Sequence, residues 1–141
     1  MTQIIEGLYL ANKETASQNN NHTLVVNCTP DLPFYYQTPK QMRISVWDRS
    51  ESHQYETMKN SIPDIIKEIE AVLKLKQNVL VYCAAGQSRS ATIIGCYLLW
   101  RNDWTIDQTV KFIKSRDSNA FFGGLTFCQV LEWVHDNKDK F

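Results

Sequence analysis

One stretch near the middle of the chain constrains the fold more than any other. An apolar run at 79–82, rich in β-branched residues, predicts a buried strand. A second apolar run at 91–100 is long enough for a helix. Cys83 and Arg89 lie between the two runs and are separated by five residues. The pattern therefore predicts a strand, a short loop and the N-terminus of a helix.

Such a loop favours a bound anion, because its backbone N–H groups and the helix dipole place positive charge at one point. The same surroundings favour the thiolate of Cys83. The planar fork of Arg89 can bind two oxygens of a phosphate group. We expect Ser90 to cap the helix and to donate its hydroxyl to the sulfur or to a leaving group. The predicted substrate-binding loop consists of Ala84, Ala85, Gly86, Gln87, Ser88 and Arg89.

These residues resemble a known motif. Cys83, Arg89 and Ser90 match the Cys-x5-Arg-Ser pattern of the cysteine-dependent protein tyrosine phosphatases, and the continuation through Ala91 and Thr92 is similar to the dual-specificity branch. The resemblance extends over roughly residues 5 to 134. It implies that residues 1–141 form a single dual-specificity phosphatase catalytic domain. The alternative from the residues alone is a buried free cysteine followed by a helix-capping Arg-Ser pair.

The resemblance implies hydrolysis of phosphotyrosine and phosphoserine/threonine in proteins through a phosphocysteine intermediate. Three alternatives remain at this point. The chain could act on RNA 5′-phosphates or small phosphoesters, it could bind phosphate with little turnover, or it could be a sulfur transferase or arsenate reductase. The neutral loop, which lacks lysines, favours phosphoprotein substrates.

A carboxylic acid should protonate the leaving group and then activate water. Our candidate is Asp48, because it follows the alternating segment 42–47, a predicted strand, as the acid of the family follows a strand. Glu51 and Asp31 are weaker alternatives. We expect no metal or other cofactor, since Arg89 and the loop N–H groups supply positive charge.

Two further positions have roles that the resemblance implies. Cys28 ends a predicted strand where some family members hold a cysteine that forms a disulfide with the nucleophile on oxidation; an ordinary buried cysteine is the alternative. Tyr82 stands where the family usually has histidine, so we expect less thiolate at Cys83 and modest activity. The aromatic cluster 34–36 either packs on the core or forms a wall of the substrate mouth.

Alternating strands and helices predict an α/β fold. The resemblance implies a protein tyrosine phosphatase-like fold, with a central, mostly parallel twisted sheet flanked by helices. Apolar periodicity and turn residues predict a strand or tight hairpin at 4–10, broken at Gly7, and strands at 24–28, 42–47 and 79–82. The same signals predict four helices. The first is at 55–75, with Ser61 as its cap and Pro63 in its first turn, and the second runs from Ser90 to about Asn102. The third is at 105–116, with Thr105 as its cap, and the fourth is at 125–134.

Composition limits the partners and the compartment. The formal net charge is +0, which gives no sign of nucleic-acid or membrane binding. The N-terminus does not resemble a signal peptide, and no run approaches the length of a membrane span. The 4 cysteines include no C-x-x-C pair, so a zinc site is not expected. A thiolate enzyme fits a reducing compartment, cytoplasmic or nuclear, with a phosphoprotein as its partner.

Overall fold

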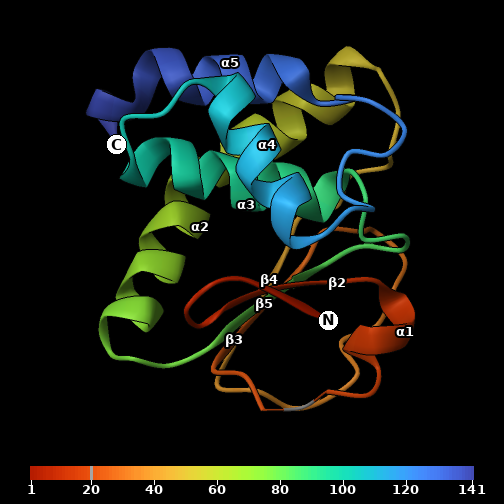
Figure 1. The fold of residues 1–141 in the computed structure, drawn as a ribbon. Coiled ribbons are helices and arrows are strands. Elements are labelled where there is room, and N and C mark those ends of the chain that lie inside the picture. Colours follow the sequence, from red (N-terminus) through yellow and green to blue (C-terminus); the bar gives the residue numbers. More distant parts are fainter. Residues whose placement is uncertain (20) are drawn as a thin grey trace.

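The structure is a computed structural model that describes residues 1–19 and 21–141. In this part of the chain, five strands form one sheet in the order β1-β2-β5-β3-β4 (Figure 1). Strands β1 and β2 pair antiparallel, whereas β2 with β5, β5 with β3 and β3 with β4 pair parallel. The strands are β1 (Thr2–Ile5), β2 (Leu8–Ala11), β3 (Leu24–Asn27), β4 (Lys40–Arg43) and β5 (Val79–Tyr82). The predicted mostly parallel sheet is confirmed.

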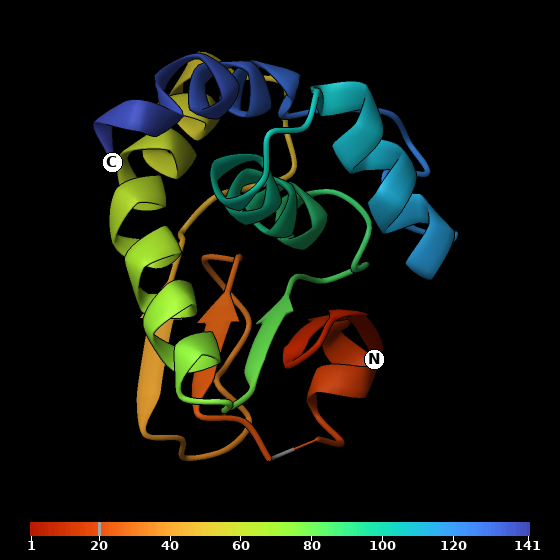
Figure 2. The same cartoon turned by 60° about the vertical axis from the view of Figure 1, so that its left-hand side comes forward.

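The longer helices pack on one face of the sheet. Side chains of these helices and of the sheet share one apolar core, with α3 in the middle of the helical layer (Figure 2). A smaller apolar cluster lies on the other face and contains Ala16 of α1 together with Leu80 and Tyr82. The helices are α1 (Lys13–Ala16), α2 (Ser52–Lys74), α3 (Arg89–Arg101), α4 (Ile106–Arg116), α5 (Cys128–Asn137) and the 3-10 turn η1 (Lys138–Lys140).

Strand β5 places the residues of the predicted loop. Its four residues are all buried, because β2 and β3 pair with it on its two sides. Side chains alternate across a strand, so Val81 and Cys83 join the core beneath the helices while Tyr82 joins the smaller cluster. The predicted boundaries of this strand, 79–82, are confirmed.

Three predicted elements, the helix at 55–75, the strand at 42–47 and the helix at 125–134, have wrong boundaries. Helix α2 starts at Ser52, so Pro63 lies inside the helix and Ser61 is not its cap. A proline within a helix removes one backbone hydrogen bond. The buried residues of α2 on both sides of Pro63, including Met58 and Ile66, hold the helix on the core. Periodicity predicted the buried face correctly, but the proline rule predicted the start wrongly.

The strand predicted at 42–47 is also wrong, since β4 ends at Arg43. The Ile44 N–H still donates to Asn27 O, at 2.9 Å, and the chain then turns because Val46 N–H donates to Ile44 O. The predicted last helix begins three residues later than 125, at Cys128. The cap at Thr105 is confirmed, because its hydroxyl accepts from Gln108 N–H and the Gln108 side chain accepts from Thr105 N–H.

Across the described residues, no helix combines the length and the apolar character that a membrane crossing requires.

Candidate active site

The loop between β5 and α3 brings the predicted nucleophile against the start of a helix. We call residues 83–90 the cradle. Cys83 is 2% exposed, and its Sγ lies 3.1 Å from the Oγ of Ser90, which is fully buried. Ser90 lies inside the first turn of α3, and Ser88 occupies the N-cap position without a side-chain capping bond. The Ser90 hydroxyl therefore lies next to the sulfur, and its donation to the sulfur or to a leaving group stays a prediction, whereas the predicted capping role of Ser90 is wrong.

Backbone contacts from distant segments hold the cradle. The Lys13 N–H donates to Ala84 O at 3.1 Å, and the Phe121 N–H donates to Gln87 O at 2.6 Å. Gly86 has a φ of +68°, and a Cβ at this position would lie 3.1 Å from the backbone of Ala11. Only glycine combines that conformation with such a close approach. The loop is thus fixed by the β2–α1 junction on one side and by the chain before α5 on the other.

The guanidinium of Arg89 is buried and partly bonded. Its Nη1 donates to Val46 O at 2.9 Å, which ties the start of α3 to the chain after β4. Its Nε is buried and has no hydrogen-bond partner within residues 1–19 and 21–141. A buried donor that stays unpaired costs about 1–3 kcal/mol. Because the helix N-terminus also carries partial positive charge, an anion at this point would satisfy both groups.

Asp48 lies in the loop that Arg89 anchors, two residues beyond Val46, and is exposed. The preceding Trp47 N–H donates to Gln54 Oε1 at 2.8 Å, so the loop is also tied to α2. This arrangement places Asp48 at the edge of the sheet where the cradle lies, although its role as the acid stays a prediction. The alternative acid Glu51 is the N-cap residue of α2 and accepts from Gln54 Nε2 at 3.2 Å. The other alternative, Asp31, is exposed in the chain between β3 and β4.

Cys28 lies beside Cys83, the predicted nucleophile. Strands β3 and β5 pair Asn27 with Tyr82, and the Cys28 N–H donates to Tyr82 O at 2.9 Å, so the register continues to Cys28 and Cys83. Both side chains belong to the same core. Burial first, and then the neighbouring Cys83, raises the pKa of Cys28 well above its usual value. Neighbouring strands lie about 4.8 Å apart, within the Cα separation of about 4.4–6.8 Å that a disulfide allows.

The side chain of Tyr82 lies on the face of the sheet opposite Cys83. Its hydroxyl donates to Pro33 O, and its ring centroid lies 5.8 Å from that of Tyr35. Burial raises the pKa of Tyr82. Phe34 and Tyr35 pack with Tyr82 in the smaller cluster, on the face opposite Cys83. Phe34 and Tyr35 therefore pack on the core, as one of the two interpretations expected, whereas Tyr36 is 37% exposed and lies outside this cluster.

Sequence reasoning missed the residues that support the cradle. Lys13, Val46 and Phe121 act there through backbone groups, which any residue type could supply. Their positions depend on chain segments meeting in space, so the sequence carries no motif for them. Among the residues that support the cradle, Gly86 alone could be recognised from its residue type.

Within the residues that the structure describes, no group of three or more His, Cys, Asp and Glu side chains could hold a metal ion.

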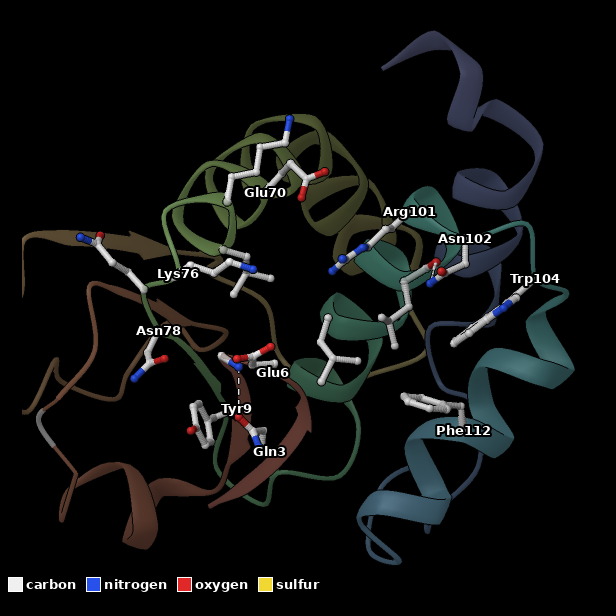
Figure 3. A pocket seen from close by; sticks show the side chains of 16 residues that line it. Gln3, Glu6, Tyr9, Glu70, Lys76, Asn78, Arg101, Asn102, Trp104 and Phe112 are labelled. Atoms are coloured by element: carbon white, nitrogen blue, oxygen red, sulfur yellow. Dashed lines mark hydrogen bonds between the residues drawn. The ribbon is translucent and has the colours of Figure 1, made fainter.

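A cavity of about 790 Å³ lies at the opposite edge of the sheet, and we call it the remote cavity (Figure 3). Its wall includes Asn78, which precedes β5, and Arg101, which ends α3. Residue rise along a strand is about 3.3 Å, so Asn78 and Cys83 are roughly 16 Å apart. This cavity is therefore separate from the cradle.

Comparisons with known proteins agree with the geometry. The family model described as the catalytic domain of dual specificity phosphatases matches residues 8–135. Human dual specificity protein phosphatase 7 is 31% identical over 100 residues, which are 67% of this chain and 22% of that protein. The putative tyrosine phosphatase 123R of Invertebrate iridescent virus 6 is 25% identical over 122 residues, covering 85% of this chain and 82% of that protein. This chain spans only about a fifth to a third of the first curated relatives that it matches.

Solved structures show the same fold. Human DUSP28 superposes with a TM-score of 0.80 at 20% identity and covers 99% of both chains. DUSP15 superposes with a TM-score of 0.80 at 25% identity and covers 99% of this chain and 90% of its own.

Proposed function

This chain belongs to the dual specificity phosphatase family, and on that basis we propose that it hydrolyses phosphate monoesters of proteins with Cys83 as the nucleophile. The proposal includes residues 1–141 as one catalytic domain. Relatives of the chain are named as dual specificity and tyrosine phosphatases. A sulfur transferase or arsenate reductase is not favoured by these matches.

The proposed reaction has two steps. The thiolate of Cys83 attacks phosphorus, an S–P bond forms, and the bond between phosphorus and the ester oxygen breaks as that oxygen takes a proton from Asp48. Asp48 then takes a proton from water, which attacks phosphorus and breaks the S–P bond to release phosphate and the thiolate. Arg89 and the loop N–H groups bind the phosphoryl oxygens throughout. The Ser90 hydroxyl, 3.1 Å from Sγ, stabilises the sulfur when it carries negative charge.

One observation carries the proposal. The sulfur of Cys83 and the hydroxyl of Ser90 lie 3.1 Å apart at the start of α3, and the Nε of Arg89, the first residue of this helix, is buried without a partner among the described residues. A buried free cysteine would need neither the buried guanidinium nor the tight turn at Gly86. An anion bound at this point is the feature that makes the whole arrangement favourable.

The test is turnover of para-nitrophenyl phosphate and of phosphopeptides by the wild type and by Cys83→Ser. We expect Cys83→Ser to lose turnover and to keep binding phosphopeptide, because the loop N–H groups and Arg89 remain. Cys96→Ser is the matched control, since Cys96 is a buried cysteine in the middle of α3. Full activity in Cys83→Ser would exclude a nucleophilic role for Cys83.

We propose phosphoproteins as the substrate class, carrying phosphotyrosine and phosphoserine/threonine. The neutral cradle, without lysine, supports this choice over polyanionic substrates. Preference for an RNA 5′-phosphate or a small phosphoester in the same assay would contradict this choice of substrate and leave the proposed role of Cys83 unchanged. Four free cysteines, including the nucleophile, support a reducing cytoplasmic or nuclear location.

We also propose that Cys28 forms a disulfide with Cys83 on oxidation. The register of β3 and β5 supports this pairing, and the bond would protect Cys83 from irreversible oxidation. Peroxide treatment followed by peptide mapping should give a Cys28–Cys83 disulfide. Recovery of activity with dithiothreitol should be much lower in Cys28→Ser than in the wild type or in Cys96→Ser. Absence of the disulfide from the wild type would reject the pairing.

A further inference from the structure

Two exposed aromatic residues, Trp47 and Phe122, directly follow residues that bond to the cradle, and we call them the rim aromatics. Phe122 is 75% exposed and Trp47 is 41% exposed. Exposed large apolar side chains that gather at one place mark interaction sites more often than isolated ones do. Neither side chain has a part in the proposed reaction.

Both rim aromatics are tied to the cradle through the residue before them. The Phe121 N–H donates to Gln87 O at 2.6 Å, and Val46 O accepts from Arg89 Nη1 at 2.9 Å. Consecutive Cα atoms are about 3.8 Å apart, so each rim aromatic starts within one residue of a cradle contact. The segments before α3, before α2 and before α5 reach the same side of the molecule (Figure 1).

The backbone around Phe122 is held in an unusual conformation. Phe121 has a φ of +59°, and its side chain is 4% exposed within the main core. A bulky residue in this region costs of the order of 1–3 kcal/mol and persists only where the surroundings fix it. The core contact and the bond to Gln87 together fix it here. These two contacts therefore hold the backbone in a conformation that leaves the next side chain, Phe122, exposed to solvent.

Space remains open beside Phe122. Gly123 and Gly124 follow it, and a Cβ built on either would meet no atom within 4 Å. On the other side of the cradle, Arg49 covers one face of the Trp47 ring, with Cζ 5.4 Å from the ring centroid, and Trp47 is still 41% exposed. A ligand side chain that reaches this rim would contact apolar rings.

We infer that the rim aromatics bind an apolar side chain next to the phosphorylated residue of a protein substrate, and that this contact sets sequence preference. The inference rests on the proposed phosphatase function. The phosphate group of a substrate would lie in the cradle, and each rim aromatic directly follows a residue that bonds to the cradle, so the residues flanking the phosphorylated one are those that reach these rings. Burial of an apolar side chain against a ring favours leucine or phenylalanine over glutamate at that position.

The experiment compares two phosphotyrosine peptides that differ only in the residues flanking the phosphotyrosine, leucine in one and glutamate in the other. For the wild type, we expect kcat/KM to be about fivefold to twentyfold higher for the leucine peptide, mostly through KM. Phe122→Ala should reduce this ratio towards 1. It should lower kcat/KM for the leucine peptide several times more than that for para-nitrophenyl phosphate, which has no flanking residue. Phe122→Leu should restore part of the ratio.

Leu75→Ala is the control, because Leu75 is 69% exposed at the C-cap of α2, beside the remote cavity. The ratio between the two peptides should be the same in this variant as in the wild type. An unchanged ratio in Phe122→Ala, or equal kcat/KM values for both peptides in the wild type, would overturn the inference while Cys83-dependent turnover still supports the phosphatase function. If turnover is absent, the same ratio is measured as Kd values on Cys83→Ser, and equal Kd values overturn the inference.

Discussion

The two ends of helix α3 carry an arginine each, and the contrast between them distinguishes the proposed active site from the remote cavity. Arg89 begins the helix and is 8% exposed, whereas Arg101 ends it and is exposed. A cation is favourable at a helix C-terminus and unfavourable at the N-terminus. The helix dipole therefore explains Arg101 as a stabilising residue. Arg89 opposes the dipole, so its place makes sense only with an anion beside it.

The surroundings of the two arginines differ in the same way. Backbone bonds from two distant segments and a close-packed glycine hold the cradle. The remote cavity has a wall of long side chains, with Glu70, Lys76 and Arg101 around its opening (Figure 3). Arg101 donates to the Tyr97 hydroxyl at 3.3 Å, and that hydroxyl donates to Glu70 at 3.0 Å. Burial, and then the bond to Glu70, raises the pKa of Tyr97 to about 12.

The volume of a cavity therefore does not indicate where the candidate active site lies in this molecule. A cavity of about 790 Å³ lies at the amino end of β5, while the candidate catalytic groups sit in a small loop at its carboxyl end. Ligands of parallel sheets bind beyond the carboxyl ends of the strands. Positioned backbone donors act more strongly on a charged group than flexible surface charges do, because they need no reorganisation.

The largest effect that would sharpen this contrast is the loss of the proposed acid. We expect Asp48→Asn to lower kcat by about 10²–10⁴ for a phosphoserine peptide, because the alkoxide leaving group needs a proton. The loss should be much smaller for para-nitrophenyl phosphate. Asp103→Asn, an exposed aspartate near the other end of α3, should leave both rates within twofold. Equal losses on both substrates would mean that Asp48 only shapes its loop.

The arginine pair gives the most direct comparison. We expect Arg89→Lys to lower kcat/KM by about 10²–10³, since a point charge cannot replace the planar fork. Arg101→Lys keeps a cation at the C-terminus of the helix and should change kcat/KM by less than twofold. Steady-state kinetics on both variants with one substrate provides the measurement. A similar loss in both variants would refute the separation of the two ends.

A smaller effect is expected at Tyr82. We expect Tyr82→His to lower the pH midpoint for alkylation of Cys83 by iodoacetamide, but only slightly, because the side chain at this position faces away from the sulfur. The loss of the hydroxyl bond to Pro33 should also reduce the free energy of unfolding by about 1 kcal/mol. Alkylation rate against pH and urea unfolding measure the two effects. Identical midpoints would make position 82 neutral for the nucleophile.

The smallest effect concerns stability at the amino edge of the sheet. Burial lowers the pKa of His22 below its usual value of 6.5, and its ring meets the Tyr9 ring at 5.5 Å. The unfolded chain then binds more protons, so the free energy of unfolding should fall as pH drops through 6.5 towards the lower folded pKa. His22→Gln should flatten this part of the curve of stability against pH. The exposed His53→Gln is the control, and a slope unaffected by His22→Gln would contradict this origin.

Much of the site followed from local sequence. The strand 79–82, the order Cys83, Arg89, Ser90 and the start of α3 all depend on short-range patterns, in which apolar period and residue type decide the structure. The hydrophobic face of α2 was predicted for the same reason, although the helix continues through Pro63 because core contacts outweigh one lost hydrogen bond. The mostly parallel sheet followed from the alternation of elements.

Only the tertiary structure decided what surrounds those residues. The bonds from Lys13 and Phe121 to the cradle, and from Arg89 to Val46, join segments that are far apart in the chain. A backbone group can make such a bond from any residue type, so no sequence pattern announces it. The outward position of Phe122 depends on the bond that the preceding Phe121 makes to Gln87. The sequence thus determined which candidate catalytic groups are present. Long-range packing determined which backbone contacts hold these groups and which side chains lie next to them.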